Sequence, residues 1–175
     1  MNAILNTVLA RWNELPESEA AREILPCCGS RRWAHALARL RPFEDATLLL
    51  QRSDEIWGQF DPADWDEAFS SHPRIGEKRA PAAATAKSAA WSSQEQGGGV
   101  AAASEDVQQR LRQANEAYER RFGRIYIVCA TGKSAEEMLA ILYRRMENDQ
   151  AAELREAAEQ QRQITQRRLK RWLEL

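Results

Sequence analysis

One short run of β-branched residues limits the folds available to this chain of 175 residues. Residues 125–130, Ile-Tyr-Ile-Val-Cys-Ala, form the only strand-like run in the sequence. No second run of similar character is present to pair with it, and a single strand cannot make a sheet. We therefore expect a buried extended segment, whose peptide groups need hydrogen-bond partners that a bound polar ring could supply. Around this segment the sequence predicts an all-α fold, a single-domain helical bundle.

Apolar residues at helical spacing occupy most of the amino-terminal part of the chain. Asn2 is the predicted cap of a helix that runs through Trp12, and Ser30 is the predicted cap of a second helix that Pro42 ends. Asp61-Pro62 is typical of a cap followed by proline at the first helical position.

The composition changes to alanine, serine and glycine between Arg79 and Ala103. Gly97-Gly98-Gly99 is typical of a flexible break in the chain. We expect a long loop here, with at most a short helix.

Helices resume at Ser104, the predicted cap of the next one. Ser134 and Glu137 form a capping box that opens another helix. A long charged helix is predicted from about Gln150 to Leu173. Its inward face should contain Leu154, Ala157, Gln161, Ile164, Arg168 and Trp172.

Arg168 is the one charged residue in that largely apolar row. A guanidinium group in such surroundings needs an anionic partner. The partner is either a carboxylate of the protein or one that belongs to a ligand, and the sequence leaves both open.

Composition excludes several classes of function. The chain has 25 lysine and arginine residues and 26 aspartate and glutamate residues, so no net field attracts nucleic acid or an anionic membrane. Its three cysteines and two histidines lack the spacing of a metal site, so we expect buried thiols and no metal. No apolar run approaches the roughly 20 residues that span a bilayer, and the amino terminus does not resemble a signal peptide, which favours the cytoplasm. The length favours one domain, residues 1–175.

Two short passages carry candidate chemistry. His72 precedes Pro73, which biases it toward extended backbone at the edge of a loop, where a side chain that titrates near neutral pH can act as acid or base. Further along, Ser92-Ser93-Gln94-Glu95-Gln96 supplies a carboxylate and amides. Each passage has an alternative: His72 can be a turn histidine bonded to the backbone, and Ser92-x-x-Glu95 can be a capping box.

An ordered series of motifs runs through nearly the whole chain. It consists of His72-Pro73-Arg74-Ile75-Gly76, Ser92-x-x-Glu95-Gln96, Asn115-x-x-Tyr118, Phe122-Gly123, residues 127–133, Arg145-x-x-Asn148-Asp149, Glu153 and Arg168-Leu169. No single motif is specific, but in this order and spacing they resemble the OHCU decarboxylase family. The full name is 2-oxo-4-hydroxy-4-carboxy-5-ureidoimidazoline decarboxylase, an enzyme of urate degradation.

The resemblance implies an all-helical fold and a cofactor-free decarboxylation of OHCU to (S)-allantoin, with the extended segment lining the active site. It implies His72 as the catalytic acid/base and Glu95 as its partner at the substrate. The residues implied to bind the substrate are Pro73, Ser92, Ser93, Gln94, Glu95, Gln96, Ile127, Val128, Cys129, Ala130, Thr131 and Arg168. The implied partner is this small molecule, with no nucleic acid and no membrane. Family members often form homodimers, although the apolar periodicity here identifies no dimer face.

The competing hypothesis is a helical protein-interaction module without catalysis. It predicts that His72 and Glu95 lie apart or exposed, with no enclosed pocket. Nucleic-acid binding through the last helix is a third class, which would show as strongly salt-dependent association.

Overall fold

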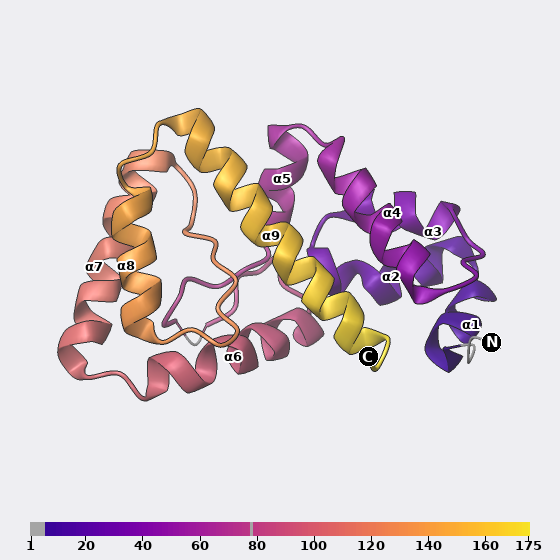
Figure 1. The fold of residues 1–175 in the computed structure, drawn as a ribbon, viewed down its shortest axis with the longest axis horizontal. Helices are drawn as coiled ribbons and strands as arrows, with labels where there is room; N and C mark the ends of the chain where they lie inside the picture. The colour runs from indigo at the N-terminus through magenta and orange to yellow at the C-terminus, as the bar shows by residue number, and fades with distance from the viewer. Residues whose placement is uncertain (1–5, 78) are drawn as a thin grey trace.

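The fold is built from helices in this computed structural model, which describes residues 6–77 and 79–175 (Figure 1). Within those ranges the chain forms nine α-helices and no strand, so the predicted all-α class is confirmed. The helices are α1 Thr7–Asn13, α2 Glu17–Cys28, α3 Arg31–Arg39, α4 Ala46–Gly58, α5 Pro62–Phe69, α6 Ala86–Ala101, α7 Glu105–Phe122, α8 Ala135–Arg145 and α9 Gln150–Trp172.

Helix α9 runs through the middle of the molecule, with α1 to α5 on one side and α7 and α8 on the other (Figure 1). A first apolar core joins α9 to α1 to α5 and includes Trp12 and Trp172, whose rings meet edge-on with centroids 5.5 Å apart. A second core lies between α7, α8 and the segment before α8, and includes Tyr118 and Leu142. Helix α9 contributes to the first core, and its Glu153 bonds to Tyr118 of α7 and Arg145 of α8, so both halves of the chain contact this helix.

Most of the predicted helix caps are confirmed. In each case the side chain accepts a hydrogen bond from an amide of the first turn, which satisfies a donor that the helix leaves free. The confirmed caps are Ser30, Asp61, Ser104 and Ser134, the last with Glu137 completing its capping box. The first helix differs, because it begins at Thr7 with Asn6 as its cap. The predicted cap Asn2 lies outside the described residues.

The predicted loop between Arg79 and Ala103 is wrong, because α6 occupies 16 of those residues. Thr85 caps α6, and the helix continues through all three glycines. Each glycine costs about 1 kcal/mol relative to alanine in a helix. Close packing requires one of them: a Cβ atom on Gly99 would lie 2.4 Å from the carbonyl oxygen of Lys133. Composition alone could not show this contact.

Residues 125–130 form neither helix nor strand and are largely buried. Ile127 and Cys129 belong to the first core, whereas their even-numbered neighbours belong to the second. Those neighbours are Tyr126, Val128 and Ala130. A side-chain period of two is that of an extended backbone, so the predicted buried extended segment is confirmed and lies between the two cores.

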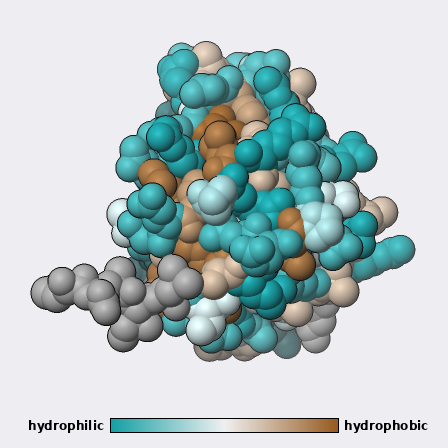
Figure 2. All heavy atoms as spheres, turned by 90° about the vertical axis from the view of Figure 1, so that its right-hand side faces the viewer, coloured by the Kyte–Doolittle hydropathy of each residue, from teal (hydrophilic) through white to brown (hydrophobic). Residues whose placement is uncertain are grey.

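The surface on the side of α1, α3 and α4 is mostly hydrophilic, with separate apolar patches (Figure 2). A groove of about 570 Å³ lined by α3, α4 and the loop between them includes the half-exposed Leu40. Among the described helices, none is both long and apolar enough to cross a membrane.

Candidate active site

A small buried cavity lies where the His72 loop, α6, α9 and the extended segment meet. Its volume is about 20 Å³, and a larger cavity of about 410 Å³ shares Pro73 and Gln96 with it. The residues that line the small cavity are His72, Pro73, Ile75, Ser92, Glu95, Gln96, Tyr126, Ile127, Val128, Ala130 and Ile164. His72 and Glu95 therefore line the same cavity and do not lie apart, which contradicts what the interaction-module hypothesis predicts.

His72 reaches the cavity from the exit of α5. Its amide donates to the carbonyl of Phe69, and Pro73 then prevents the helix from continuing. Three residues beyond Pro73, Gly76 turns the chain with a φ of 89°, a left-handed conformation that favours glycine. This turn returns the chain to α6, because the Gly76 amide donates to Gln96 Oε1 at 3.1 Å.

The tautomer of His72 follows from its contact with Gln161. The His72 Nε2 atom lies 2.7 Å from Gln161 Oε1. The Gln161 amide nitrogen is already directed at the Cys28 carbonyl at 3.3 Å and the Thr165 hydroxyl at 3.1 Å, which leaves its oxygen for the histidine. Nε2 therefore carries the hydrogen and donates it, so that Nδ1 of the neutral ring holds a free lone pair.

His72 is neutral in this site. Burial lowers the pKa of His72 to about 3, and the positive charge of Arg168 contributes in the same direction, while the hydrogen bond to Gln161 opposes both. A neutral ring must accept a proton before it can deliver one, so His72 begins as a base.

Glu95, which lines the same cavity as His72, forms an ion pair with Arg168. Arg168 donates to Glu95 through Nε at 2.9 Å and Nη2 at 2.8 Å, and its side chain is 1% exposed. Ser92 Oγ and the Pro26 carbonyl accept further hydrogen bonds from it at 2.9 and 3.1 Å. The anion that the sequence required for Arg168 is thus a carboxylate of the protein, whereas the neighbouring Arg167 is exposed.

Arg168 was predicted to bind the substrate, and in the structure it binds Glu95. Its planar fork holds Glu95, and Arg168 is not among the residues that line the cavity. Its direct contact with the substrate stays a prediction, and the contact that the structure shows is the one that orients Glu95. Glu95 keeps an 18% exposed side chain at the cavity, and each carboxylate oxygen retains a lone pair for a ligand.

Helical periodicity divides the predicted passage of residues 92–96. Ser92, Glu95 and Gln96 face the small cavity. Ser93 and Gln94 are exposed; Ser93 lines the larger cavity, and Gln94 bonds to Arg171. The split follows from the 3.6-residue repeat of α6, which the loop prediction did not include.

The extended segment divides in a similar way. Ile127, Val128 and Ala130 line the small cavity. Cys129 turns its side chain into the first core, and Thr131 is exposed beyond the end of the segment. Neither Cys129 nor Thr131 lines the cavity. Within the described part of the chain, no group of three or more His, Cys, Asp and Glu residues could hold a metal ion.

Sequence comparison identifies the family of this chain. The family profile described as OHCU decarboxylase matches residues 13–170. This chain belongs to that family. A relative from Arabidopsis thaliana, named uric acid degradation bifunctional protein TTL, is 35% identical over 143 residues. The matched region covers 82% of this chain and 44% of that protein, so the chain spans less than half of that relative's length.

Solved structures agree with this family assignment. A crystal structure described as OHCU decarboxylase in the presence of (S)-allantoin is 33% identical, with a TM-score of 0.75, and the match covers 87% of this chain and 98% of that chain. A structure described as (S)-allantoin synthase has a TM-score of 0.71 at 18% identity, covers 94% of this chain and 53% of that chain, and supports the fold alone.

One residue of this OHCU decarboxylase family site had no predicted role in it. Gln161 was placed on the inward face of the last helix, but its bond to His72 was not expected. The available signal was its position two helical turns before Arg168, on the same face of α9. A polar residue in an apolar row, like Arg168 itself, indicates a buried partner.

Proposed function

We propose that this chain decarboxylates OHCU to (S)-allantoin without a cofactor, with His72 as acid/base and Glu95 at the substrate. The observation that carries the proposal is a neutral His72 with a fixed tautomer, facing the same cavity as the carboxylate of Glu95. The similar crystal structure described as OHCU decarboxylase in the presence of (S)-allantoin supports the choice of substrate and product.

The proposed reaction needs one electron acceptor and one proton relay. When carbon dioxide leaves, its bonding electron pair moves into the ring, and the neighbouring imine receives it while the imine nitrogen takes a proton from water. The substrate therefore provides the electron sink that a cofactor supplies in other decarboxylases. Nδ1 of His72 accepts the proton of the ring hydroxyl and returns it to the adjacent ring carbon as the carbonyl forms. Delivery from one face sets the (S) configuration.

The low pKa of His72 fits the second proton transfer, from the ring of His72 to the substrate carbon. A histidinium ion in these surroundings readily gives up its proton to carbon. An anionic substrate beside the ring raises the pKa of His72 toward neutral, because opposite charges favour the protonated form. Binding of the substrate therefore makes His72 a stronger base for the first proton transfer, from the ring hydroxyl to Nδ1.

Glu95 and Ser92 are proposed to orient the ring. The Glu95 carboxylate accepts a hydrogen bond from the substrate, while Arg168 holds that carboxylate in one orientation. Ser92 Oγ already accepts from Arg168, so its hydroxyl hydrogen is available to a ligand.

Entry of the substrate requires a wall of the small cavity to move. A volume of about 20 Å³ holds one water-sized body. Pro73 and Gln96 separate this cavity from the larger one, and Gln96 is held by a single bond to the Gly76 amide. We propose that the Gln96 side chain swings to join the two cavities when the substrate binds, and that Ser93 then lies at its edge.

The assembly and location of the chain are further proposals. We propose one domain, because α9 packs into the first core and also bonds to α7 and α8. We propose a cytoplasmic homodimer, supported by the family assignment and by three free, buried cysteines. Size-exclusion chromatography with light scattering tests the dimer.

The decisive experiment generates OHCU from urate in the cuvette and follows allantoin by circular dichroism. With the protein present, a single (S) signal should appear much faster than in its absence. His72→Ala should lower kcat by about 1,000-fold, since acid–base catalysis of this kind contributes 10²- to 10⁴-fold. The matched control is His35→Ala, which replaces the exposed histidine on α3. Slow racemic product from folded wild-type protein would refute the proposed activity.

A further inference from the structure

Side chains bond to three peptide groups of the extended segment, and a fourth group, the Ala130 carbonyl, accepts from the Lys133 amide at 3.0 Å. In an extended chain, the N–H and C=O groups of successive residues point to opposite sides. Arg145 Nη1 donates to the Ile127 carbonyl at 2.6 Å. The Cys129 amide donates to Gln160 Oε1 at 2.9 Å, and the Cys129 carbonyl accepts from Lys133 Nζ at 2.8 Å. All three bonds involve odd-numbered positions.

Even-numbered residues of the segment line the cavity, as Ile127 also does. Val128 and Ala130 both line it and are 4% and 6% exposed. The N–H groups of these two residues and the Val128 carbonyl form no hydrogen bond with any residue in 6–77 or 79–175. A buried peptide group without a partner is costly, so these groups favour a ligand that bonds to them.

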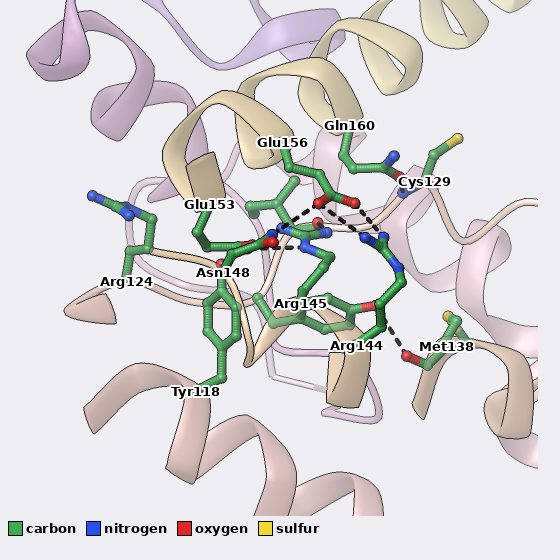
Figure 3. A network of polar contacts seen from close by, with 12 residues as sticks. Tyr118, Arg124, Cys129, Met138, Arg144, Arg145, Asn148, Glu153, Glu156 and Gln160 are labelled. Atoms are coloured by element: carbon green, nitrogen blue, oxygen red, sulfur yellow. Dashed lines mark hydrogen bonds and ion pairs between the residues drawn. The ribbon is translucent and has the colours of Figure 1, made fainter. Parts of the chain in front are cut away.

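A buried ion pair fixes one of the odd-numbered bonds. Arg145 and Glu153 have side chains that are 0% exposed, and Arg145 donates to Glu153 Oε1 through Nε at 2.9 Å and Nη2 at 2.5 Å. Tyr118 donates to the same oxygen, and Asn148 donates to the other at 2.9 Å (Figure 3). The guanidinium group is therefore held in one orientation, with its remaining arm on the Ile127 carbonyl.

Gln160 fixes the other bond from α9. Figure 3 shows its side chain beside Cys129, well apart from the Arg145 guanidinium. Among the described residues, the bond from Cys129 is the only hydrogen bond of the Gln160 side chain, which is half-buried. Gln160 is therefore a more selective probe than Arg145, whose loss would leave Glu153 buried without a cation.

We propose that Gln160 and Arg145 are positioning residues, which hold the odd-numbered peptide groups so that the Val128 and Ala130 peptide groups point at the substrate. This inference rests on the proposed decarboxylase activity. The ligand groups that suit these sites are a carbonyl oxygen for the two N–H groups and an N–H for the Val128 carbonyl, both of which an oxo-imidazoline ring carries. The amides then stabilise charge that develops on the ring oxygen.

The test replaces Gln160 with a residue of similar size that cannot accept a hydrogen bond. Gln160→Leu should lower kcat/KM by about 10- to 100-fold, with a melting temperature close to wild type. Gln160→Glu keeps an acceptor for the Cys129 amide and should restore most of the activity. Gln163→Leu, one turn further along α9 where the side chain bonds to Glu159, is the matched control and should behave as wild type. The pH profile of kcat/KM should keep its shape in Gln160→Leu, because His72 is untouched.

Amide hydrogen exchange gives a readout that does not depend on turnover. The Cys129 amide should be protected in wild type and Gln160→Glu and should exchange faster in Gln160→Leu, while added (S)-allantoin should protect the Val128 and Ala130 amides only where Cys129 is held. Wild-type kcat/KM in a Gln160→Leu protein whose Cys129 amide is unprotected would overturn the proposal. If Gln160→Leu does not fold, Arg145→Lys takes its place, since it keeps a cation for Glu153 but shortens the reach to Ile127. Absence of turnover in wild type would refute the activity alone, because the exchange data still test the positioning.

Discussion

The two walls of the candidate site are held by the same type of ion pair in different surroundings. On the helical wall, Arg168 orients Glu95, whose carboxylate remains 18% exposed at the cavity. On the extended wall, Arg145 binds Glu153 where neither side chain is exposed, and its free arm reaches the main chain. The Arg168–Glu95 pair therefore orients a side chain toward the substrate, whereas the Arg145–Glu153 pair orients peptide groups of the extended segment. Both pairs use α9, which makes this helix the common support of the site.

Arg145→Met should cause the largest loss of stability, because it removes the ion pair that supports the extended segment. It leaves Glu153 fully buried without a cation, which costs about 5 kcal/mol, the upper end of what such truncations cause. Urea unfolding measures this loss. The adjacent Arg144 pairs with Glu156 on the surface, so Arg144→Met should change stability by less than about 1 kcal/mol. Equal effects of the two substitutions would show that the buried Arg145–Glu153 pair contributes no more to stability than the surface pair.

These two pairs also show what could be predicted from the sequence. Arg168 was expected to need an anion because it interrupts an apolar row, and that reasoning was sound for a residue on a regular helix. Arg145 and Glu153 entered only through the family resemblance, since their partners lie on different helices and on a main-chain carbonyl. Residue types reveal the charge that must be satisfied, but not which distant atom satisfies it.

The fold shows the same limit at α6. Caps such as Ser104 and Ser134 were predictable because a side chain meets an amide three residues away. The helix through Gly97-Gly98-Gly99 was not, since local propensity opposes it and packing against Lys133 supports it. With α6 assigned to a loop, the separation of Ser92 and Glu95 from Ser93 and Gln94 could not be foreseen.

Arg168→Met should cause the next largest loss of stability, because it removes the ion pair between α6 and α9. Glu95 loses its cation but retains some access to water, so we expect a loss of about 3 kcal/mol, the lower end of the range for buried pairs. Arg167→Met replaces an exposed neighbour and should lie within about 0.5 kcal/mol of wild type. If Arg168→Met proved as stable as Arg167→Met, the pair would serve only to orient Glu95.

Gly99→Ala tests the contact that joins the two walls. The added methyl group would lie 2.4 Å from the Lys133 carbonyl oxygen, so α6 or the loop after the extended segment must shift, at a cost of about 1–3 kcal/mol. Gly97→Ala and Gly98→Ala meet nothing within 4 Å and should gain up to about 1 kcal/mol through helix propensity. Thermal unfolding of the three variants should show a lower melting temperature for Gly99→Ala and an equal or higher one for Gly97→Ala and Gly98→Ala. A gain at all three positions would mean that the walls are not in close contact at Gly99.

The pH dependence of stability tests whether the helices and the extended segment around the cavity together exclude water from His72. The pKa of His72 is lowered from about 6.5 in the unfolded chain to about 3 in the folded protein. Between these values the unfolded chain binds a proton that the folded protein does not, so the free energy of unfolding falls as the pH decreases. Wild type should lose about 1 kcal/mol more than His72→Asn on going from about pH 6 to about pH 5, since one proton per pH unit is worth about 1.4 kcal/mol. Urea unfolding at the two pH values measures the difference, in which other titrating groups cancel. Parallel pH curves would mean that water reaches the imidazole ring, and then neither wall would keep His72 neutral.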